Sequence, residues 1–308
     1  MEEILSVQDL KRVYGRGTAA TQALGGVSLS VEQGEFVGIM GPSGSGKTTI
    51  GRAIMRILPT SGGEVFYKGQ KINGKISHAL DKQVIKEIQM IFQDPQSSLN
   101  ERAKVSYIVG EGLQNVRPEL SAAQREEKVR QALLDVGLLP EFASRFPHEF
   151  SGGQRQRIGI ARALIVEPEF IVADEPISAL DMSIRAQVLN LLRQLQKQRG
   201  ITYLFIAHDL SVMRYISDRI AVIRKGHIVE LADAEELVTH PLHPYTRSLL
   251  SAIPMPDPRR EREKQLLVYD PAMHDYTAAP PAWRELRPRH WVLCNDAESE
   301  RWSAENIF

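Results

Sequence analysis

Cysteine is almost absent from this sequence of 308 residues, in which Cys294 is the only one. One thiol cannot form a disulfide within the chain, and it cannot supply the several cysteines that a zinc or iron–sulfur site usually requires. A secreted, disulfide-stapled scaffold is therefore excluded. We expect the protein to reside in a reducing compartment.

An excess of charge and long apolar runs are also missing. Lys and Arg together number 38 and Asp and Glu together 38, which disfavours binding to nucleic acid through bulk positive charge, and we expect no nucleic-acid partner. The apolar run at 201–207 is far shorter than the about 20 residues that cross a bilayer. The acidic N-terminus, MEEILSVQDL, does not resemble a signal peptide. Any work at a membrane would therefore require membrane-spanning partners.

Short apolar runs alternate with helical patterns from about Ile4 to Ile253, which predicts an α/β fold built on a mainly parallel sheet. The runs are 36–40, 88–92, 170–173, 203–207 and 220–223. Near the N-terminus, the runs 27–31, 36–40 and 64–67 are separated by short turn sequences. This spacing predicts a small antiparallel β-subdomain that contains these three runs.

Strand patterns are missing between Asp94 and Pro147, where a helical insert is predicted. Ser121 and Gln124 have the spacing of a capping box, and Gly137 is a suitable stop for the helix that follows Ser121. We expect one large domain at 1–253, with a helical subdomain at about 94–165. The segment 254–308 holds 7 of the 17 prolines and all three tryptophans. That composition predicts a separate tail without regular helices or central strands, wrapped onto the body or onto a partner.

The sequence GPSGSGKT at 41–48 fits the P-loop pattern G-x-x-x-x-G-K-[ST]. It lies between the predicted strand 36–40 and a helical run at 49–57, as a phosphate-binding loop requires. Glycines allow backbone N–H groups to converge on phosphate oxygens, while Lys47 would reach the β- and γ-phosphates and Thr48 would ligate Mg²⁺. A chance glycine-rich turn would not account for this context. The predicted nucleotide-binding residues are Gly41, Ser43, Gly44, Ser45, Gly46, Lys47, Thr48 and Thr49.

The apolar run at 170–173 ends in two carboxylates, Asp174 and Glu175. The carboxyl end of a parallel strand is where such a sheet presents its ligands. Asp174 would hold Mg²⁺, and Glu175 could accept a proton from the water that attacks the γ-phosphate. Without the P-loop, a solvated acidic strand end would be the better interpretation.

A second glycine-rich helix start, Ser151-Gly152-Gly153-Gln154, precedes a helical run at 155–165. With it the sequence resembles the ATP-binding cassette (ABC) ATPases, whose signature is LSGGQ, although Phe150 replaces the leucine. The resemblance covers about 250 residues and implies an RecA-like core. It assigns four further positions: Tyr14 to adenine stacking, Gln93 to the Q-loop that contacts Mg²⁺, Asp181 to the D-loop, and His208 to the switch histidine. Lys47, Gln93, Glu175 and His208 are thereby expected to be catalytic, with ATP and Mg²⁺ as cofactors.

Two further stretches narrow the resemblance. QDPQSSLN at 93–100 and HPLHPYTR at 240–247 are similar to segments of peptide-import ATPases, in particular the second ATPase of Gram-positive oligopeptide permeases. This implies a second ABC ATPase subunit, either a paralogue or a copy of this chain. It also implies two transmembrane permease subunits, indirect work with an extracellular peptide-binding protein, and a peripheral position at the cytoplasmic face of a bacterial plasma membrane. Many such ATPases carry a cysteine-rich C-terminal region that can ligate an iron–sulfur cluster, and with Cys294 alone we expect none here.

Three alternatives remain to be weighed. A related importer for dipeptides, nickel or glutathione-like compounds would use the same motifs, since the ATPase does not touch cargo. A soluble ABC ATPase of repair would need long coiled-coil insertions, and one of translation would need two cassettes in the chain; the sequence has neither. A P-loop GTPase or small-molecule kinase would leave SGGQ unexplained, and the guanine-reading N-K-x-D element is absent.

Overall fold

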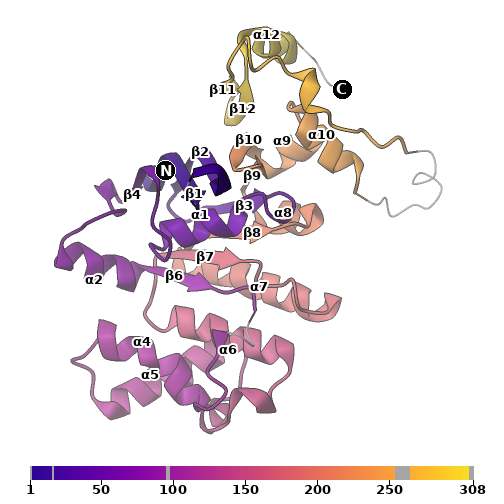
Figure 1. Ribbon diagram of the computed structural model, residues 1–308. Coiled ribbons are helices and arrows are strands. Elements are labelled where there is room, and N and C mark those ends of the chain that lie inside the picture. The colour runs from indigo at the N-terminus through magenta and orange to yellow at the C-terminus, as the bar shows by residue number, and fades with distance from the viewer. Residues whose placement is uncertain (1, 16, 95–97, 254–263, 305–308) are drawn as a thin grey trace.

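The computed structural model describes residues 2–15, 17–94, 98–253 and 264–304. Figure 1 shows three regions one above the other: a helical region at the bottom, two sheets with their covering helices in the middle, and the C-terminal tail at the top. Within the described residues, every helix is too short or too polar to span a bilayer.

A small antiparallel sheet has the strand order β2-β1-β4-β5. Its strands are β1 (Glu3–Tyr14), β2 (Thr21–Glu32), β4 (Gly62–Tyr67) and β5 (Gln70–Lys71). The runs 27–31 and 64–67 lie in it as predicted, but the run 36–40 does not, so its assignment to the antiparallel subdomain is wrong. That run, FVGIM, is buried along its whole length. A strand covered on both faces belongs in a parallel sheet between two helical layers.

The larger sheet has the order β11-β12-β10-β9-β3-β8-β7-β6. Its parallel part comprises β3 (Phe36–Met40), β6 (Ile88–Ile91), β7 (Phe170–Asp174), β8 (Thr202–Ala207) and β9 (Arg219–Arg224). These five strands match the predicted runs to within a few residues. β10 (His227–Asp233) joins β9 in antiparallel orientation through a tight turn.

Side chains alternate between the two faces of this sheet, and each face has its own apolar core. Phe36 and Phe205 pack on one face with α6 (Gly152–Leu164), α7 (Met182–Arg199) and α8 (Leu210–Ile216). Val37 and Leu204 pack on the other face with α1 (Lys47–Ile54) and the small sheet. The parallel strands are therefore covered on both sides, which fixes where their carboxyl ends can be reached by a ligand.

The helical region contains α4 (Val105–Val116), α5 (Ala122–Asp135) and α6. The capping box predicted at the start of α5 is present: the Ser121 hydroxyl accepts from Gln124 N, and the Gln124 side chain accepts from Ser121 N. Gly137 follows the end of this helix with φ +70°, in the conformation that favours glycine. α2 (His78–Glu87) precedes β6 and contacts α4.

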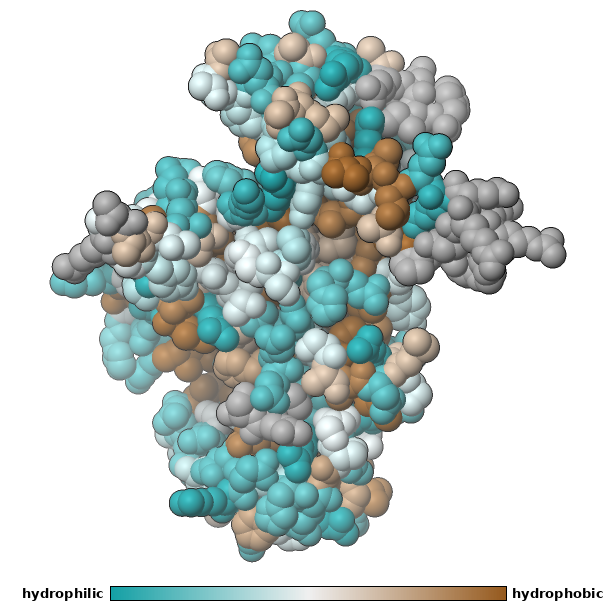
Figure 2. Space-filling model, turned by 45° about the vertical axis from the view of Figure 1, so that its right-hand side comes forward, coloured by the Kyte–Doolittle hydropathy of each residue, from teal (hydrophilic) through white to brown (hydrophobic). Residues whose placement is uncertain are grey.

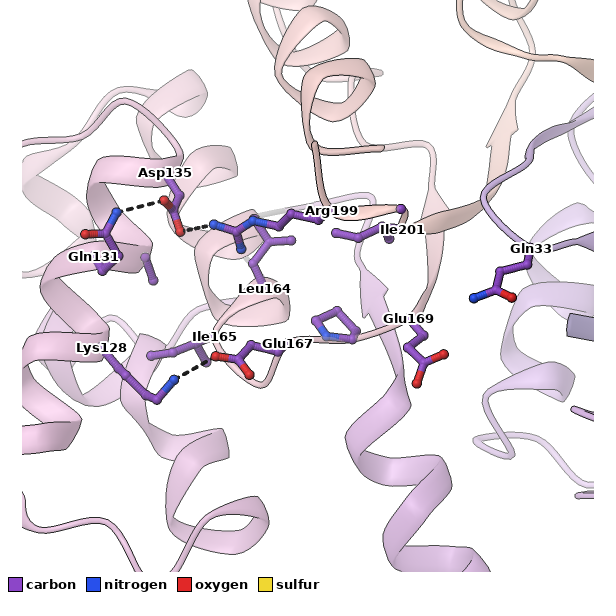
Figure 3. Close-up of a pocket in the computed structure, with 13 residues that line it drawn as sticks. Gln33, Lys128, Gln131, Asp135, Leu164, Ile165, Glu167, Glu169, Arg199 and Ile201 are labelled. Atoms are coloured by element: carbon purple, nitrogen blue, oxygen red, sulfur yellow. Dashed lines mark hydrogen bonds and ion pairs between the residues drawn. The ribbon is translucent and has the colours of Figure 1, made fainter. Parts of the chain in front are cut away.

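A cavity of about 570 Å³ lies between α5 and the start and end of the β7–α7 unit, and Figure 3 shows its lining. Two ion pairs cross it. Asp135 of α5 pairs with Arg199 at the end of α7, and Lys128 Nζ of α5 lies 2.7 Å from Glu167 Oε1, ahead of β7. These contacts tie α5 to both the start and the end of the βα unit that carries Asp174.

The tail forms regular structure, so the prediction that it lacks helices and central strands is wrong. β11 (Ala282–Arg287) and β12 (His290–Cys294) form a hairpin, and β12 pairs with β10, which extends the larger sheet. α12 (Asp296–Ala304) follows. The prolines do not prevent this, because Pro281 immediately precedes β11 and Pro288 lies in the hairpin turn, where no ladder N–H is needed.

The tail is anchored by a small apolar cluster of Leu242, Val292, Cys294 and Trp302. Burial raises the pKa of the Cys294 thiol to about 11, so it stays a thiol at neutral pH. Figure 2 shows a mostly polar face with apolar atoms gathered between the tail and the body. Three exposed apolar residues of the tail follow one another in sequence: Leu266, Leu267 and Val268. Before the tail, α9 (Ala234–Thr239) and α10 (Pro244–Ser251) lie against β10.

Candidate nucleotide site at the ends of the parallel strands

The P-loop connects β3 to α1. Residues 41–46 form the loop, and α1 begins at Lys47, two residues earlier than the helical run predicted from the sequence, so that Thr48 and Thr49 lie in its first turn. Gly46 precedes the helix with φ +110°, and a Cβ there would lie 2.8 Å from the carbonyl oxygen of Ala23. Only glycine fits that position. The helix N-terminus therefore opens onto a loop that includes Gly41, Ser43, Gly44 and Ser45.

Lys47 is 4% exposed and its ammonium lies inside this loop. Nζ donates to the carbonyl oxygens of Gly41 at 2.7 Å and of Pro42 at 2.9 Å, and lies 3.9 Å from Glu175 Oε1. Burial lowers the pKa of Lys47, while the charges of Glu175 and Asp174 oppose that effect. A cation held among backbone carbonyls at a helix N-terminus is placed to exchange those contacts for phosphate oxygens.

Asp174 ends β7 beside the first turn of α1. The Thr48 hydroxyl donates to Asp174 Oδ1 at 2.9 Å. Burial raises the pKa of Asp174, whereas the hydrogen bond from Thr48 and the charge of Arg52 lower it. A hydroxyl and a carboxylate oxygen side by side are the hard oxygen donors that Mg²⁺ prefers, so the donor set fits this ion.

Glu175 is the point on which the other predicted catalytic residues converge. Gln93 Nε2 donates to Glu175 Oε2 at 3.1 Å, and His208 Nδ1 lies 3.5 Å from the same oxygen. Gln93 follows β6 and His208 follows β8, so the two side chains reach Glu175 from the strands on either side of β7. Glu175 has φ +45°, and its N–H donates to Ile206 O at 2.9 Å. A non-glycine residue held in this region is typical of functional sites.

The SGGQ segment forms a second helix start, at α6. This helix begins at Gly152, three residues earlier than predicted, with a capping box in which Ser151 Oγ accepts from Gln154 N at 3.4 Å and Gln154 Oε1 accepts from Ser151 N at 3.0 Å. Gly153 packs against α7, because a Cβ on it would lie 2.5 Å from Ile184 Cγ2. Asp181 caps α7 by accepting from Ile184 N at 3.0 Å. SGGQ and the Asp181 loop therefore form one continuous surface.

The predicted nucleotide-site residues do not all lie close to one another within this chain. Figure 1 places α6 with α4 and α5 below β7, whereas α1 lies above it, so the SGGQ loop does not reach the P-loop of its own chain. Tyr14 ends β1 with 39% of its surface exposed, and the Arg12 guanidinium lies 4.6 Å from the centre of its ring. The structure thus divides the predicted set into a cluster around Lys47 and Glu175 and a separate surface around Ser151.

One contact to the P-loop has no signal in the sequence. Gly226, in the turn between β9 and β10, donates its N–H to the carbonyl oxygen of Ser45 at 2.8 Å. The partners are far apart in the chain and the contact uses backbone atoms alone. Only the pairing of β9 beside β3 brings them together.

Three features together define an ATP-binding cassette ATPase. They are a P-loop at the start of α1, a strand that ends in two carboxylates, and a separate SGGQ helix start. Residues 24–178 match the family model described as ABC transporter, and residues 229–278 match the oligopeptide/dipeptide transporter C-terminal region. The chain therefore belongs to the ABC transporter family, in its oligopeptide/dipeptide group, and it is an ATPase.

Individual relatives agree with this membership. The chain is 55% identical over 304 residues to the oligopeptide transport ATP-binding protein OppF of Streptococcus pyogenes, with 99% of both chains covered. It is 56% identical over 301 residues to the oligopeptide transport ATP-binding protein AmiF of Streptococcus pneumoniae, with 98% of both covered. A solved dimeric ATP-binding cassette in a post-hydrolysis state with ADP and Pi is 31% identical, with a TM-score of 0.69 over 75% of this chain and 99% of that one.

Proposed function

We propose that this chain is the ATP-hydrolysing subunit of an importer of oligopeptides, bound at the cytoplasmic face of a bacterial plasma membrane. The observation that carries the proposal is the convergence of Lys47, Gln93 and His208 on Glu175, beside the Thr48–Asp174 pair. Residues 1–253 would form the ATPase domain, with a helical subdomain at about 94–165, and residues 254–308 the tail.

The residues divide the chemistry among them. Lys47 and the N–H groups of the P-loop would bind the phosphates and offset their charge. Thr48 and Asp174, with Gln93 as the resemblance implies, would hold Mg²⁺, which when bound neutralises charge on the β- and γ-phosphates. Glu175 would accept the proton of the attacking water, and Gln93 and His208 fix its orientation by their contacts to Oε2. Tyr14 would stack on adenine.

A complete site requires a second cassette. Because SGGQ lies away from the P-loop of its own chain, the residues Ser151, Gly152, Gly153 and Gln154 would bind the nucleotide held by a partner cassette, with Asp181 on the same surface. That partner is a paralogue or a second copy. A relative solved as a dimer with ADP and Pi supports this arrangement.

Closing of the cassette dimer on ATP would drive two membrane-spanning permease subunits, which receive peptide from an extracellular binding protein. The names of the relatives, which specify oligopeptide transport, support this cargo. Dipeptides are the second candidate, because the C-terminal family match is described as oligopeptide/dipeptide. As the resemblance implies, residues 97–100 after the Q-loop glutamine would contact a permease subunit; of these, Ser97 lies outside the described residues.

Substitution of Lys47 and Glu175 tests the proposed chemistry. In the assembled transporter, Lys47→Ala should abolish hydrolysis and weaken ATP binding, because a phosphate counter-charge is lost. Glu175→Gln should retain ATP binding and lower the hydrolysis rate about a hundredfold or more, since the proton acceptor is removed. ATP should therefore accumulate a closed dimer of the Glu175→Gln variant, detectable by size-exclusion chromatography.

Glu169→Gln is the matched control, since this partly exposed carboxylate precedes the same strand and pairs with Lys68. It should hydrolyse ATP at the parent rate. Parent-rate hydrolysis by Glu175→Gln would instead show that Glu175 does not accept the proton.

A further inference from the structure

Tyr269 of the tail contacts the end of β9, the strand that pairs with the P-loop strand β3. Tyr269 lies ahead of the short helix Pro271–Met273, and the Arg224 guanidinium at the end of β9 lies 4.5 Å from the centre of its ring. Tyr245 of α10 flanks the same guanidinium at 5.5 Å, and the two tyrosine rings meet edge to face at 5.3 Å. A cation between two rings gains from both quadrupoles, so Arg224 is held in place from the C-terminal side.

Arg224 leads directly into the turn that contacts the P-loop. It pairs with His227 across the turn, and Lys225 and Gly226 between them have φ of +45° and +80°. Gly226 N donates to Ser45 O at 2.8 Å, and Gly226 O accepts from Gly25 N at 2.9 Å. The turn is confined, because a Cβ on Gly226 would lie 2.6 Å from Ala23 O. A shift of Arg224 is therefore transmitted to the backbone of Ser45.

A second connection runs through α10. Ser248 Oγ of this helix donates to Leu267 O of the tail at 2.8 Å, and Ser251 Oγ accepts from Leu267 N at 3.0 Å. The end of α10 faces a cavity of about 580 Å³ whose lining includes the first P-loop residues, Gly41 and Pro42, and His208. The tail is thus bonded to a helix that also borders the nucleotide site.

We propose that Tyr269 is a positioning residue for ATP binding, which acts through Arg224 and the Gly226 turn on the backbone of Ser45. The proposal rests on the proposed role of the P-loop in binding ATP, and it gives the tail a function in the catalytic cycle. Loss of the ring frees Arg224, the turn relaxes, and the N–H groups next to Ser45 are less well oriented toward phosphate. The chemical step, which depends on Glu175, is affected less.

The experiment measures KM and kcat for ATP in the assembled transporter and the Kd for ATP of the full chain. Tyr269→Leu and Arg224→Met should each raise KM and Kd about threefold, with kcat changed less, as expected from the free energy of one cation–π contact. Tyr269→Phe keeps the ring over the guanidinium and should restore parent values. The double variant should show no loss beyond that of Arg224→Met, because this change already removes the contact with Tyr269.

Trp283→Leu is the matched control. Trp283 stacks on Trp291 within the tail hairpin, whereas among the described residues the rings over the Arg224 guanidinium are those of Tyr245 and Tyr269. If it raises KM as much as Tyr269→Leu, the tail contributes only general stability and the proposal is wrong. Parent values for Tyr269→Leu, or additive effects in the double variant, would also overturn it. A parent chain that does not bind ATP would refute the proposed function instead.

Discussion

At the scale of single residues, Ser45 of the P-loop buries a hydroxyl that the described part of the protein does not satisfy with a hydrogen bond. Ser45 is only 4% exposed, yet its buried Oγ has no hydrogen-bond partner among the described residues. Buried polar groups without partners cost stability, so their retention at a site points to a ligand. The neighbouring Lys47 and Thr48, by contrast, both have protein partners.

Ser45→Ala should separate ligand binding from folding. The free energy of unfolding of the nucleotide-free chain should change by less than about 0.5 kcal/mol, because no protein hydrogen bond is removed. The affinity for ATP should fall about three- to tenfold, as one hydrogen bond to the ligand is lost. Calorimetric titration with ATP and denaturant unfolding measure the two quantities. Ser144→Ala, which removes a surface hydroxyl that donates to Glu141 O, should alter neither; an unchanged ATP affinity for Ser45→Ala would contradict the prediction.

At the scale of elements, α10 begins with a buried histidine in place of the usual capping hydroxyl or carboxylate. His243 Nδ1 accepts from Tyr245 N at 3.0 Å, and the ring is 1% exposed. Burial lowers the pKa of His243 to about 3, and the charges of His274, Arg224 and Arg247 act in the same direction. The cap therefore depends on a neutral ring, because a protonated Nδ1 cannot accept a hydrogen bond.

This cap should make stability depend on pH in one direction. The folded pKa of about 3 lies below the ordinary value of 6.5, so between these values the unfolded chain binds a proton that the folded chain does not. Stability should fall as pH drops below 6.5, by up to about 1.4 kcal/mol per pH unit from this group. His243→Asn keeps a capping oxygen and cannot titrate, so its unfolding free energy should fall less steeply between pH 6.5 and 4.5. Equal slopes in denaturant titrations of both proteins would show that His243 does not control this effect.

At the scale of the whole molecule, the tail extends the central sheet and packs in a small apolar cluster that also includes Leu242 of the cassette. β12 pairs with β10. Glu230 Oε1 of β10 lies 2.7 Å from His290 Nε2 of β12, and both side chains are fully buried. Arg289 in the hairpin turn also pairs with Asp233 at 3.0 Å. Polar and charged side chains of the tail thus contact those of the cassette where the two parts meet. The tail and the nucleotide site therefore belong to one continuous sheet.

Trp302→Ala should unfold the tail before the cassette. Trp302 is 1% exposed and packs with Leu242 and Val292, and truncation of a buried aromatic costs about 3–5 kcal/mol. Hydrogen exchange should increase in β11, β12 and α12. β3, β7 and β8 should stay protected, because their side chains pack in the two larger apolar clusters, which do not include Trp302. ATP affinity should fall only about threefold, through the loss of the Tyr269 contact. Equal loss of protection in β3 would mean that tail and cassette unfold as one unit.

The sequence by itself determined the features that are local in the chain. The P-loop, the two carboxylates after an apolar strand, the capping box at Ser121 and the glycine-rich helix start at Ser151 each depend on neighbouring residues, so their patterns can be recognised without knowledge of the fold. The five parallel strands were predicted for the same reason. The resemblance to ABC ATPases named the proposed catalytic residues, because the order of motifs along the chain can be read without any knowledge of distances.

Only the tertiary structure decided the features that depend on pairing between distant segments. The run 36–40 is apolar in either kind of sheet, and its place beside β8 and β9 follows from long-range hydrogen bonds. The prolines of the tail concealed a hairpin because what matters is their position relative to the strands, which composition does not give. The Tyr269–Arg224 and Gly226–Ser45 contacts join residues far apart in sequence, one by a ring and a cation and the other by backbone atoms alone. Neither kind of contact leaves a pattern in a single sequence, since its energy arises only when the chain has folded.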